Sequence, residues 1–239
     1  MKRALVTGGS GGIGAAICRR LAADGCHVIV HANRSGDKAD AVVAEIVAGG
    51  GSAKAVVFDV TDRALSGAAL ADILAAGPVQ ILVNNAGIHA DAVFPGMSGE
   101  QWDSVIDVSL NGFFNVTRPL ILPMIRTRWG RIITVSSVAG ISGNRGQVNY
   151  SAAKGALHGA SKALALEVAS RGITVNAVAP GIIATGMIAG TFDAEAIKAL
   201  VPMKRAGRPE EVADLVAFLA SDQAAYISGQ IISINGALI

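Results

Sequence analysis

The strongest constraint on the fold is a regular alternation of short apolar segments and longer segments with helical spacing. The apolar segments predict strands at residues 3–6, 27–31, 53–58, 80–83, 131–135, 173–179 and 230–234. Helices are predicted at residues 15–23, 37–48, 64–75, 101–126, 149–170 and 209–220, with Pro119 and Pro123 marking bends or an early end of the longest one. Strands that alternate with helices form a parallel sheet covered on both faces. We therefore expect an α/β fold with a seven-stranded parallel sheet and helices on both faces.

Length and composition agree with one domain. A chain of 239 residues can form one large core, and no Pro/Ser-rich linker, charge block or internal repeat divides it. The hydrophobic share of 51%, against 16% charged residues, indicates long buried strands or extensive subunit interfaces. We expect a single doubly wound domain over residues 1–239.

Charge and residue types argue against several function classes. A formal charge of +2 without a basic cluster does not indicate nucleic-acid binding. No segment approaches the roughly 18 uninterrupted apolar residues of a spanning helix, and the apolar run near Met1 is too short for a secretory signal. Cys18, Cys26 and the four histidines lack redox or metal-ligand spacing. We expect a cytoplasmic protein without membrane, nucleic-acid or metal binding.

A glycine-rich turn follows the first predicted strand. Residues 7–14 read TGGSGGIG and lead directly into the helical segment 15–23. A strand, such a turn and a helix point free backbone N–H groups at a phosphate, and glycines let the backbone approach the ligand. Flexible loops share this composition, but the position after the first strand favours a dinucleotide site. We therefore expect a Rossmann-type domain.

The other candidate binding residues also follow predicted strands. In open α/β sheets, ligands bind beyond the carboxyl ends of the strands. The residues at these ends are Asn33 and Arg34 after the second strand, Asp59 after the third, Asn84-Asn85-Ala86-Gly87 after the fourth, Ser136-Ser137 after the fifth and Pro180-Gly181 after the sixth. We expect them to line one site at one edge of the sheet.

Tyr150 and Lys154 are four residues apart in a predicted helix, and Ser137 lies thirteen residues before Tyr150. Residues i and i+4 share a helix face, so the phenol and the ammonium are expected side by side. A phenol titrates near ~10, and a cation about 4 Å away supplies roughly the 4 kcal/mol that brings its pKa to about 7. Such a tyrosine can exchange a proton with an oxygen that Ser137 holds. For the pair alone, an exposed Tyr and Lys at chance spacing is the alternative.

Together these motifs resemble the short-chain dehydrogenase/reductase family, and the resemblance runs from residue 3 to residue 236. Its pieces are the turn at 7–14, Asp59, NNAG at 84–87, the set Ser137/Tyr150/Lys154, and Pro180-Gly181 with Thr185 nearby. Within the family, residues 129–133, 143–150, 170–176 and 220–229 are most similar to 3-oxoacyl-[acyl-carrier-protein] reductases. The resemblance implies reduction of a carrier-bound 3-oxoacyl group to the 3-hydroxyacyl form, in fatty-acid, polyketide or polyene synthesis.

The resemblance also implies a nicotinamide dinucleotide. NAD-specific relatives place a carboxylate after the second strand, whereas this chain has Asn33 and Arg34, and a guanidinium suits a 2′-phosphate. NADPH is therefore expected over NADH, with a solvated loop cation as the alternative for Arg34. The implied cofactor-binding residues are Gly8, Ser10, Gly12, Ile13, Gly14, Asn33, Arg34, Asp59, Val60, Asn85, Ala86, Gly87, Tyr150, Lys154, Pro180, Gly181, Ile183 and Thr185.

In the implied reaction, Tyr150 donates a proton to the substrate oxygen and Ser137 orients that oxygen. Lys154 binds the ribose hydroxyls and lowers the tyrosine pKa. The family's fourth catalytic residue is an Asn whose backbone carbonyl holds a relay water, and Ser109 occupies its position here. Asn111 lies two residues on, about 200° around a helix, and should face elsewhere. Because a serine keeps the carbonyl, we expect Ser109 to support the relay with reduced efficiency.

The resemblance implies two kinds of protein contact. Arg128 and Arg171 match arginines that meet an acidic acyl carrier protein near the mouth of the site, with solvated surface arginines as the alternative. A homotetramer is expected to pack through the helices that follow the fourth and fifth strands. Residues from about 185 to 205 are expected to form a substrate lid.

Two other functions remain open from the sequence. The chain could act on a free alcohol, sugar or steroid. It could also be a catalytically weak subunit partner, because Ser109 replaces the usual Asn. Neither the acyl chain length nor the pathway follows from the residues.

Overall fold

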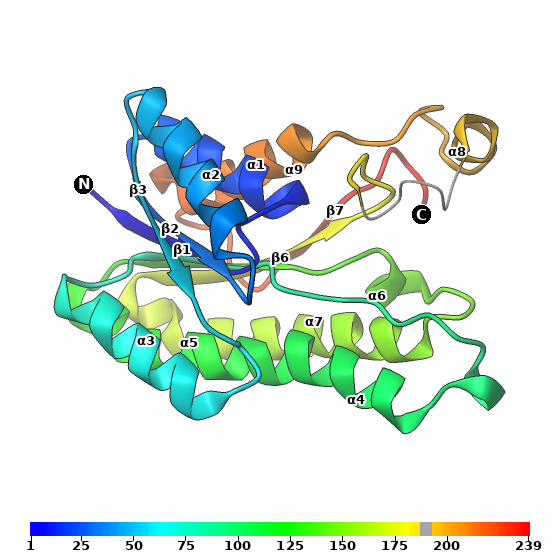
Figure 1. Cartoon of the computed structure of the whole chain (residues 1–239), viewed down its shortest axis with the longest axis horizontal. Coiled ribbons are helices and arrows are strands. Elements are labelled where there is room, and N and C mark those ends of the chain that lie inside the picture. Colours follow the sequence, from blue (N-terminus) through cyan, green and yellow to red (C-terminus); the bar gives the residue numbers. More distant parts are fainter. Residues whose placement is uncertain (187–192) are drawn as a thin grey trace.

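A computed structural model describes residues 1–186 and 193–239. Its centre is a seven-stranded sheet with the strand order β3-β2-β1-β4-β5-β6-β7 (Figure 1). All neighbouring strands are parallel. The strands are β1 (Arg3–Val6), β2 (His27–Ala32), β3 (Ser52–Val57), β4 (Ile81–Asn84), β5 (Gly130–Val135), β6 (Ile173–Pro180) and β7 (Ile231–Ile234). The predicted seven-stranded parallel sheet is confirmed.

The central strands are continuously buried because helices cover both of their faces. Every residue of β5 and β6 is buried, whereas no residue of the edge strand β7 is. Valine and isoleucine in these strands pack well on a pleated surface. A strand buried on both sides therefore lacks the polar alternation of a half-exposed strand.

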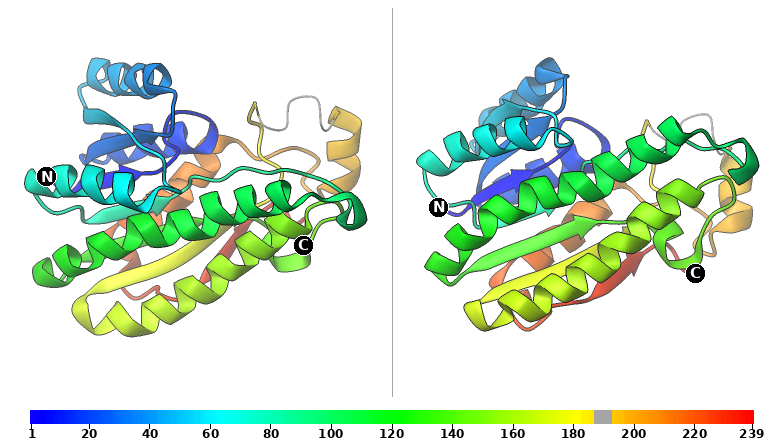
Figure 2. Two further views of the ribbon diagram at one scale, coloured as in Figure 1. Left: turned by 60° about the horizontal axis from the view of Figure 1, so that its bottom comes forward. Right: turned by 90° about the horizontal axis from the view of Figure 1, so that it is seen from below.

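Two layers of helices enclose the sheet (Figures 1 and 2). One face carries α1 (Gly12–Ala23), α2 (Gly36–Ala48) and α9 (Pro209–Ala220). The other carries α3 (Arg63–Ala75), α4 (Gly99–Ile106), α5 (Gly112–Thr127) and α7 (Val148–Val168). Successive side chains of β1 alternate between two cores: Ala4 and Val6 join the first, and Leu5 joins the second. The doubly wound arrangement is thus confirmed.

The predicted helix at 101–126 is two helices joined by a π-helical turn, η2 (Asp107–Asn111). Helix α5 continues past Pro119 and Pro123 to Thr127, so of the two predicted alternatives, bends or an early end, the early end is wrong. Each proline removes one backbone hydrogen bond. The buried stripe of Val116, Leu120 and Met124 offsets that loss by holding α5 against the sheet.

Several short segments have no counterpart in the sequence prediction. They are η1 (Phe94–Gly96), α6 (Ala139–Ser142), η3 (Ala169–Arg171), α8 (Ala194–Leu200) and η4 (Asp222–Ala224). None spans more than 7 residues, which is too short for a helical period to stand out from the sequence.

The predicted lid at about 185–205 is described only in part, because residues 187–192 lie outside the described residues. On its N-terminal side, Ile183 pairs with Gly207 in an isolated parallel bridge. On its C-terminal side, the Met203 N–H donates to the Gly236 carbonyl at 3.2 Å. Both ends of the segment are therefore attached near the carboxyl ends of β6 and β7.

Candidate active site

The glycine-rich turn lies between β1 and α1. Gly8 and Gly12 have positive φ angles of 62° and 52°, which glycine adopts without strain. A Cβ atom at Gly14 would lie 2.1 Å from the Gly8 carbonyl oxygen, so the helix can approach the strand only with glycine here. Helix α1 starts without a side-chain cap and without an acidic residue in its first turn. Its open N–H groups therefore fit the pyrophosphate of a dinucleotide.

Thr7 and Asn85 hold this turn against the segment that follows β4. The Thr7 hydroxyl oxygen accepts hydrogen bonds from the backbone N–H groups of Asn85 and Ala86, both at 3.0 Å. The Asn85 side-chain amide donates to the carbonyl oxygens of Thr7 and Gly8 at 2.9 and 3.0 Å. The Asn85 side chain therefore braces the turn, a function that the sequence analysis did not predict for it.

The predicted catalytic side chains meet beyond the carboxyl end of β5. Ser137 follows β5, and its hydroxyl oxygen accepts a hydrogen bond from the Ala139 N–H at 3.1 Å. Tyr150 and Lys154 lie one turn apart near the start of α7. The Lys154 Nζ atom is 5.6 Å from the centroid of the Tyr150 ring, and a Cβ atom at Gly87 would approach Nζ to 3.1 Å. The motifs after β4 and β5 thus converge on one lysine.

Burial governs the protonation of both α7 groups. It raises the pKa of Tyr150, while a hydrogen bond with Ser137 acts in the opposite direction. It lowers the pKa of Lys154 to about 8, and Nζ donates to the Val135 carbonyl at 2.9 Å. The predicted lowering of the Tyr150 pKa by Lys154 is not found here, because burial dominates and the ammonium is bonded to the strand. A protonated phenol is the form that can donate a proton.

Asn149 anchors the start of α7, and the sequence analysis missed it. Its side chain is fully buried, and the amide donates to the carbonyls of Ala90 and Gln101 at 3.0 and 2.9 Å. These contacts join α7 to the loop after β4 and to α4. The adjacent Tyr150 is thereby held in position, and adjacency to Tyr150 was the only signal in the sequence.

Ser136 and His158 form a second unpredicted contact behind the site. The Ser136 hydroxyl lies 2.6 Å from His158 Nε2 and donates to the Lys154 carbonyl at 3.1 Å. Since its single proton goes to that carbonyl, the histidine must be the donor in the shorter contact. The pair ties the end of β5 to the helix that carries Lys154.

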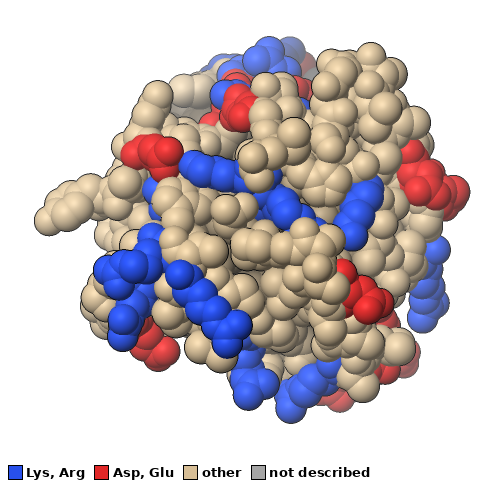
Figure 3. Space-filling model, turned by 90° about the vertical axis from the view of Figure 1, so that its left-hand side faces the viewer, with Lys and Arg blue, Asp and Glu red and all other residues tan. Residues whose placement is uncertain are grey.

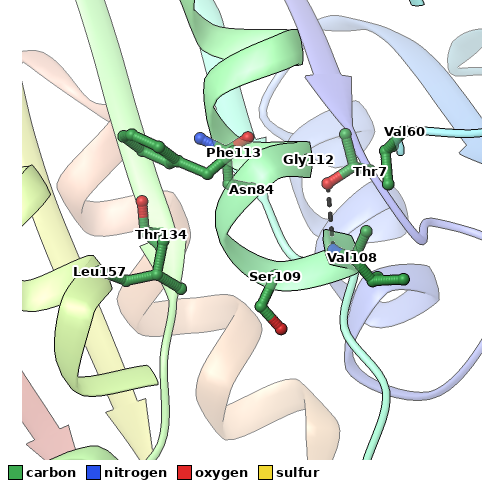
Figure 4. Close-up of a pocket in the computed structure, with 10 residues that line it drawn as sticks. Thr7, Val60, Asn84, Val108, Ser109, Gly112, Phe113, Thr134 and Leu157 are labelled. Atoms are coloured by element: carbon green, nitrogen blue, oxygen red, sulfur yellow. Dashed lines mark hydrogen bonds between the residues drawn. The ribbon is translucent and has the colours of Figure 1, made fainter. Parts of the chain in front are cut away.

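Ser109 lies in the π-helical turn η2 and is 3% exposed. Its hydroxyl has no hydrogen-bond partner among the described residues, and it lines a small cavity with Thr134 and Leu157 (Figure 4). Asn111 faces elsewhere, as expected: it is exposed and donates to the Asp107 carboxylate at 2.6 Å. π-Helical turns are rare and frequent at functional sites, but a regular periodicity does not reveal them.

The residues after β2 and β3 extend the same edge of the sheet. Asn33 and Arg34 are exposed directly after β2. After β3, one Asp59 carboxylate oxygen accepts from the backbone and hydroxyl of Thr61 at 2.9 and 2.8 Å, which fixes its orientation. Val60 is buried beside it. These residues therefore lie at the carboxyl edge of the sheet, where ligands bind in open α/β folds.

The segment after β6 closes toward the glycine-rich turn. The Pro180 carbonyl accepts from the Val138 N–H at 3.0 Å, which connects it to the catalytic loop. Thr185 reaches the turn, since a Cβ atom at Gly12 would lie 3.6 Å from its Cγ2 atom. Ile183 is buried between these points. The predicted residues of this segment thus border both halves of the site.

Comparison with known proteins identifies the family. A family model described as short chain dehydrogenase matches residues 2–196. The chain belongs to the short-chain dehydrogenase family. It is an oxidoreductase of that family, and its glycine-rich turn fits the nicotinamide dinucleotide that the family uses.

Curated relatives match this short-chain dehydrogenase over nearly its whole length. The 3-oxoacyl-[acyl-carrier-protein] reductase FabG of Escherichia coli is 48% identical over 99% of this chain and 97% of its own. The 3-oxoacyl-[acyl-carrier-protein] reductase of Synechocystis is 47% identical, over 99% and 96%. Nodulation protein G of Azospirillum brasilense is also 47% identical, over 99% and 98%.

In this short-chain dehydrogenase, Arg128 and Arg171 lie at the opposite edge of the sheet from the site. Arg128 ends α5 just before β5, and Arg171 lies just before β6. Both are exposed, and Arg128 donates to the Ser170 carbonyl at 3.3 Å. Figure 3 views the molecule from this side and shows Lys and Arg side chains gathered across it. Within one chain, the two arginines therefore do not approach the mouth of the active site.

Arg131, by contrast, is a buried structural cation. It is 2% exposed, donates to the Ser221 carbonyl at 3.1 Å and lies 3.4 Å from the Asp222 carboxylate.

Among the described residues, no group of three His, Cys, Asp or Glu side chains could hold a metal ion. Likewise, none of the helices in the described part of the chain is long and apolar enough to cross a membrane.

Proposed function

We propose that this short-chain dehydrogenase reduces a 3-oxoacyl group carried on an acyl carrier protein to the 3-hydroxyacyl form, with NADPH as the reductant. The observation that carries the proposal is the convergence of Ser137, Tyr150 and Lys154 beside the glycine-rich turn. The names of the full-length relatives support the substrate class.

The residues divide the chemistry among them. The bound nicotinamide would supply the hydride for the β-keto carbon. Tyr150 holds the proton that goes to the ketone oxygen, and its raised pKa keeps that proton on the phenol near neutral pH. Ser137, which hydrogen-bonds the phenol, orients the same oxygen. Lys154 would donate hydrogen bonds to the ribose hydroxyls of the bound cofactor and adds positive charge behind Tyr150.

Ser109 supports this chemistry through its backbone rather than its side chain. The relay proposed for the family uses a main-chain carbonyl in this position, and serine retains that group. The π-helical turn supports the assignment, because it departs from the regular hydrogen-bond ladder around Ser109.

NADPH is proposed over NADH because of the residues after β2. Asn33 and Arg34 are exposed there, and neither carries the carboxylate that would repel a 2′-phosphate. A guanidinium binds phosphate through paired, charge-assisted hydrogen bonds. Arg34 would therefore favour NADPH over NADH by binding the 2′-phosphate that only NADPH carries.

Exposed apolar side chains around the site support an acyl substrate. Ile88, Val93 and Phe94 follow β4 and are 41, 57 and 62% exposed, and Ile141 of α6 is 47% exposed. The Ala92 N–H donates to the Gly146 carbonyl at 2.9 Å, which joins the loops after β4 and β5. An apolar rim of this kind favours an acyl chain over a sugar.

The carrier and the assembly belong to the same proposal. Arg128 and Arg171 would contact an acidic carrier, which requires that a second copy of the chain bring its active site toward them.

Exposed apolar residues on α5 and α7, among them Leu122 and Leu166 at 64 and 86% exposure, support a homotetramer through these helices (Figure 2). We propose a cytoplasmic location, in keeping with two buried cysteines that form no disulfide.

The decisive experiment measures NADPH oxidation by the purified protein with a 3-oxoacyl carrier substrate. We expect turnover to fall by about 10³-fold or more in Tyr150→Phe, because the proton donor is lost. Tyr226→Phe is the matched control, since Tyr226 is fully exposed and precedes β7, at the edge of the sheet opposite the carboxyl ends of the strands. Turnover of small ketones or sugars but not of carrier substrates would redirect the proposal to a free alcohol or sugar. Cofactor binding without any turnover would favour a subunit partner.

A further inference from the structure

His31 lies beneath the glycine-rich turn and takes no part in the chemistry proposed above. It is the fifth residue of β2, and its side chain is 1% exposed. The Gly8 backbone N–H points at its Nδ1 atom at 3.1 Å, and its Nε2 atom lies 2.9 Å from the Phe58 carbonyl oxygen. A buried imidazole in contact with both neighbouring strand ends is an unusual choice, because the other buried residues of β2 are apolar.

The two contacts determine the tautomer. An N–H group faces Nδ1, so Nδ1 must be the acceptor, and a carbonyl faces Nε2, so Nε2 must carry the proton. A doubly protonated ring would direct an N–H against the Gly8 N–H. The neutral ring with the proton on Nε2 is therefore the only form that satisfies both partners.

The backbone of the same residue reinforces the turn. The His31 carbonyl accepts a hydrogen bond from the Gly9 N–H at 2.8 Å. Two successive N–H groups of the turn, at Gly8 and Gly9, are thus bonded to one residue of β2. The remaining N–H groups, at the start of α1, stay open for an anion.

The imidazole also connects two strands that do not touch. β2 lies between β1 and β3 in the sheet, so the ends of β1 and β3 share no backbone ladder. The ring packs on Phe58 with 4.2 Å between centroids, next to Asp59 and Val60. Its two nitrogen atoms therefore join the pyrophosphate turn to the segment assigned to the adenine.

We propose that His31 is a positioning residue for the dinucleotide, which sets the distance between the pyrophosphate turn at Gly8 and the adenine segment that begins at Phe58. The inference rests on the proposed dinucleotide cofactor and goes beyond it, because His31 would not touch the cofactor. Its effect is on cofactor affinity rather than on the rate of the chemical step.

Three variants separate the two hydrogen bonds. His31→Asn can retain an acceptor for Gly8, His31→Gln can retain a donor for Phe58, and His31→Phe fills the volume without either bond. The matched control is His27→Asn, because His27 lies on the same strand and the same sheet face at the distant amino end.

The primary readout is the dissociation constant for NADP⁺, measured by calorimetry without substrate. We expect it to rise about tenfold in His31→Phe and nearly as much in His31→Gln, with His31→Asn within about threefold of wild type. Turnover at saturating cofactor should stay within about threefold in all of them. Equal binding by every variant, or stronger binding by His31→Gln than by His31→Asn, would overturn the proposal.

A second readout keeps the test independent of activity and of folding losses. The ¹⁵N spectrum of labelled histidine should contain an imidazole with an unprotonated Nδ1 and a protonated Nε2 whose signals disappear in His31→Asn and remain in His27→Asn. The opposite tautomer would refute the geometry directly. If wild type binds NADP⁺ but reduces no carrier substrate, the proposed function fails while the His31 inference stands. If wild type binds no dinucleotide, both fail.

Discussion

The Nζ atom of Lys154 lies 5.6 Å from the centre of the Tyr150 ring, yet it donates its hydrogen bond to the Val135 carbonyl of the neighbouring strand. The lysine is therefore held by the sheet as well as by its own helix. Its charge is kept inside the protein at a free-energy cost, and this cost makes the first prediction possible.

Lys154→Met should abolish turnover and stabilise the fold. Burial lowers the Lys154 pKa from its usual 10.5 to about 8, equivalent to about 3 kcal/mol of destabilisation at pH 7. The variant also loses the hydrogen bond to Val135, which costs about 1 kcal/mol of stability. We therefore expect the free energy of unfolding to rise by about 2 kcal/mol in the variant. Urea denaturation at pH 7 measures it.

The pH dependence of that gain provides the control. Between pH 8 and 10.5 the unfolded lysine binds a proton that the folded one has released, so wild-type stability rises with pH. The advantage of Lys154→Met should therefore shrink across this window. A constant difference between pH 7 and 10 would mean that the buried charge is not its source.

His31 should make the protein sensitive to acid. Burial lowers its pKa from 6.5 to about 4, against the weaker opposing effects of the Phe58 carbonyl and the Asp59 carboxylate. The stability that the neutral His31 ring contributes is fully present above pH 6.5 and is lost as the pH falls toward 4. The total loss in the free energy of unfolding is about 3 kcal/mol.

The test compares wild type with His31→Asn in urea at pH 7, 6 and 5. Burial also lowers the pKa of His27 and His158, so the difference between the two proteins is the relevant quantity. We expect the loss of stability on acidification to be clearly smaller in the variant. Parallel pH curves would refute the prediction.

Ser109→Ala should leave the fold as stable as wild type or up to about 1 kcal/mol more stable. The hydroxyl is buried and has no hydrogen-bond partner among the described residues, so removing it relieves a desolvation penalty. Turnover should stay within about threefold, because the backbone carbonyl remains. A 100-fold loss of turnover would assign the function to the hydroxyl instead; Ser137→Ala is the comparison expected to show such a loss.

Arg34→Asp should reverse the cofactor preference. The guanidinium that suits a 2′-phosphate is replaced by a carboxylate that repels it and can accept a hydrogen bond from a ribose hydroxyl. We expect the ratio of the NADPH to the NADH dissociation constant to rise by about 100-fold or more. Arg145→Asp, in the loop between α6 and α7, controls for the change in net charge. An unchanged ratio would mean that Arg34 is a solvated loop cation that does not bind the 2′-phosphate.

Gly14→Ala should destabilise the protein by at least about 2 kcal/mol, because its Cβ atom would lie 2.1 Å from a backbone oxygen. Gly11→Ala is the matched control in the same turn, since no atom of the described residues beyond its chain neighbours lies within 4 Å of a Cβ there. Thermal unfolding distinguishes them. Similar melting temperatures for the two variants would contradict the close approach of α1 to β1.

Much of the fold and the site could be predicted because it follows from local patterns. Short apolar segments between helical segments indicated the seven strands. The carboxyl ends of parallel strands must then lie at one edge of the sheet. Ser137, Tyr150 and Lys154 came together because Ser137 follows β5 closely and the other two lie one turn apart near the start of α7. The same rule places Arg128 and Arg171 at the amino edge, since both precede strands.

Other features depend on contacts between residues distant in the chain. The π-helical turn at Ser109, the bracing of Gly8 by Asn85 and the link from His31 to Phe58 appear only when separate elements pack together. The protonation of Tyr150 and Lys154 likewise depends on how completely the surrounding elements exclude water.

The order of strands and helices, the family resemblance and the identity of the residues at the strand ends can therefore be read from the amino-acid sequence. These follow from backbone preference and hydrophobic period, which neighbouring residues encode. The packing of the folded chain sets which polar atoms meet, which charges lose their water and which surfaces stay open. Those properties arise from packing between distant segments, and no local pattern encodes them.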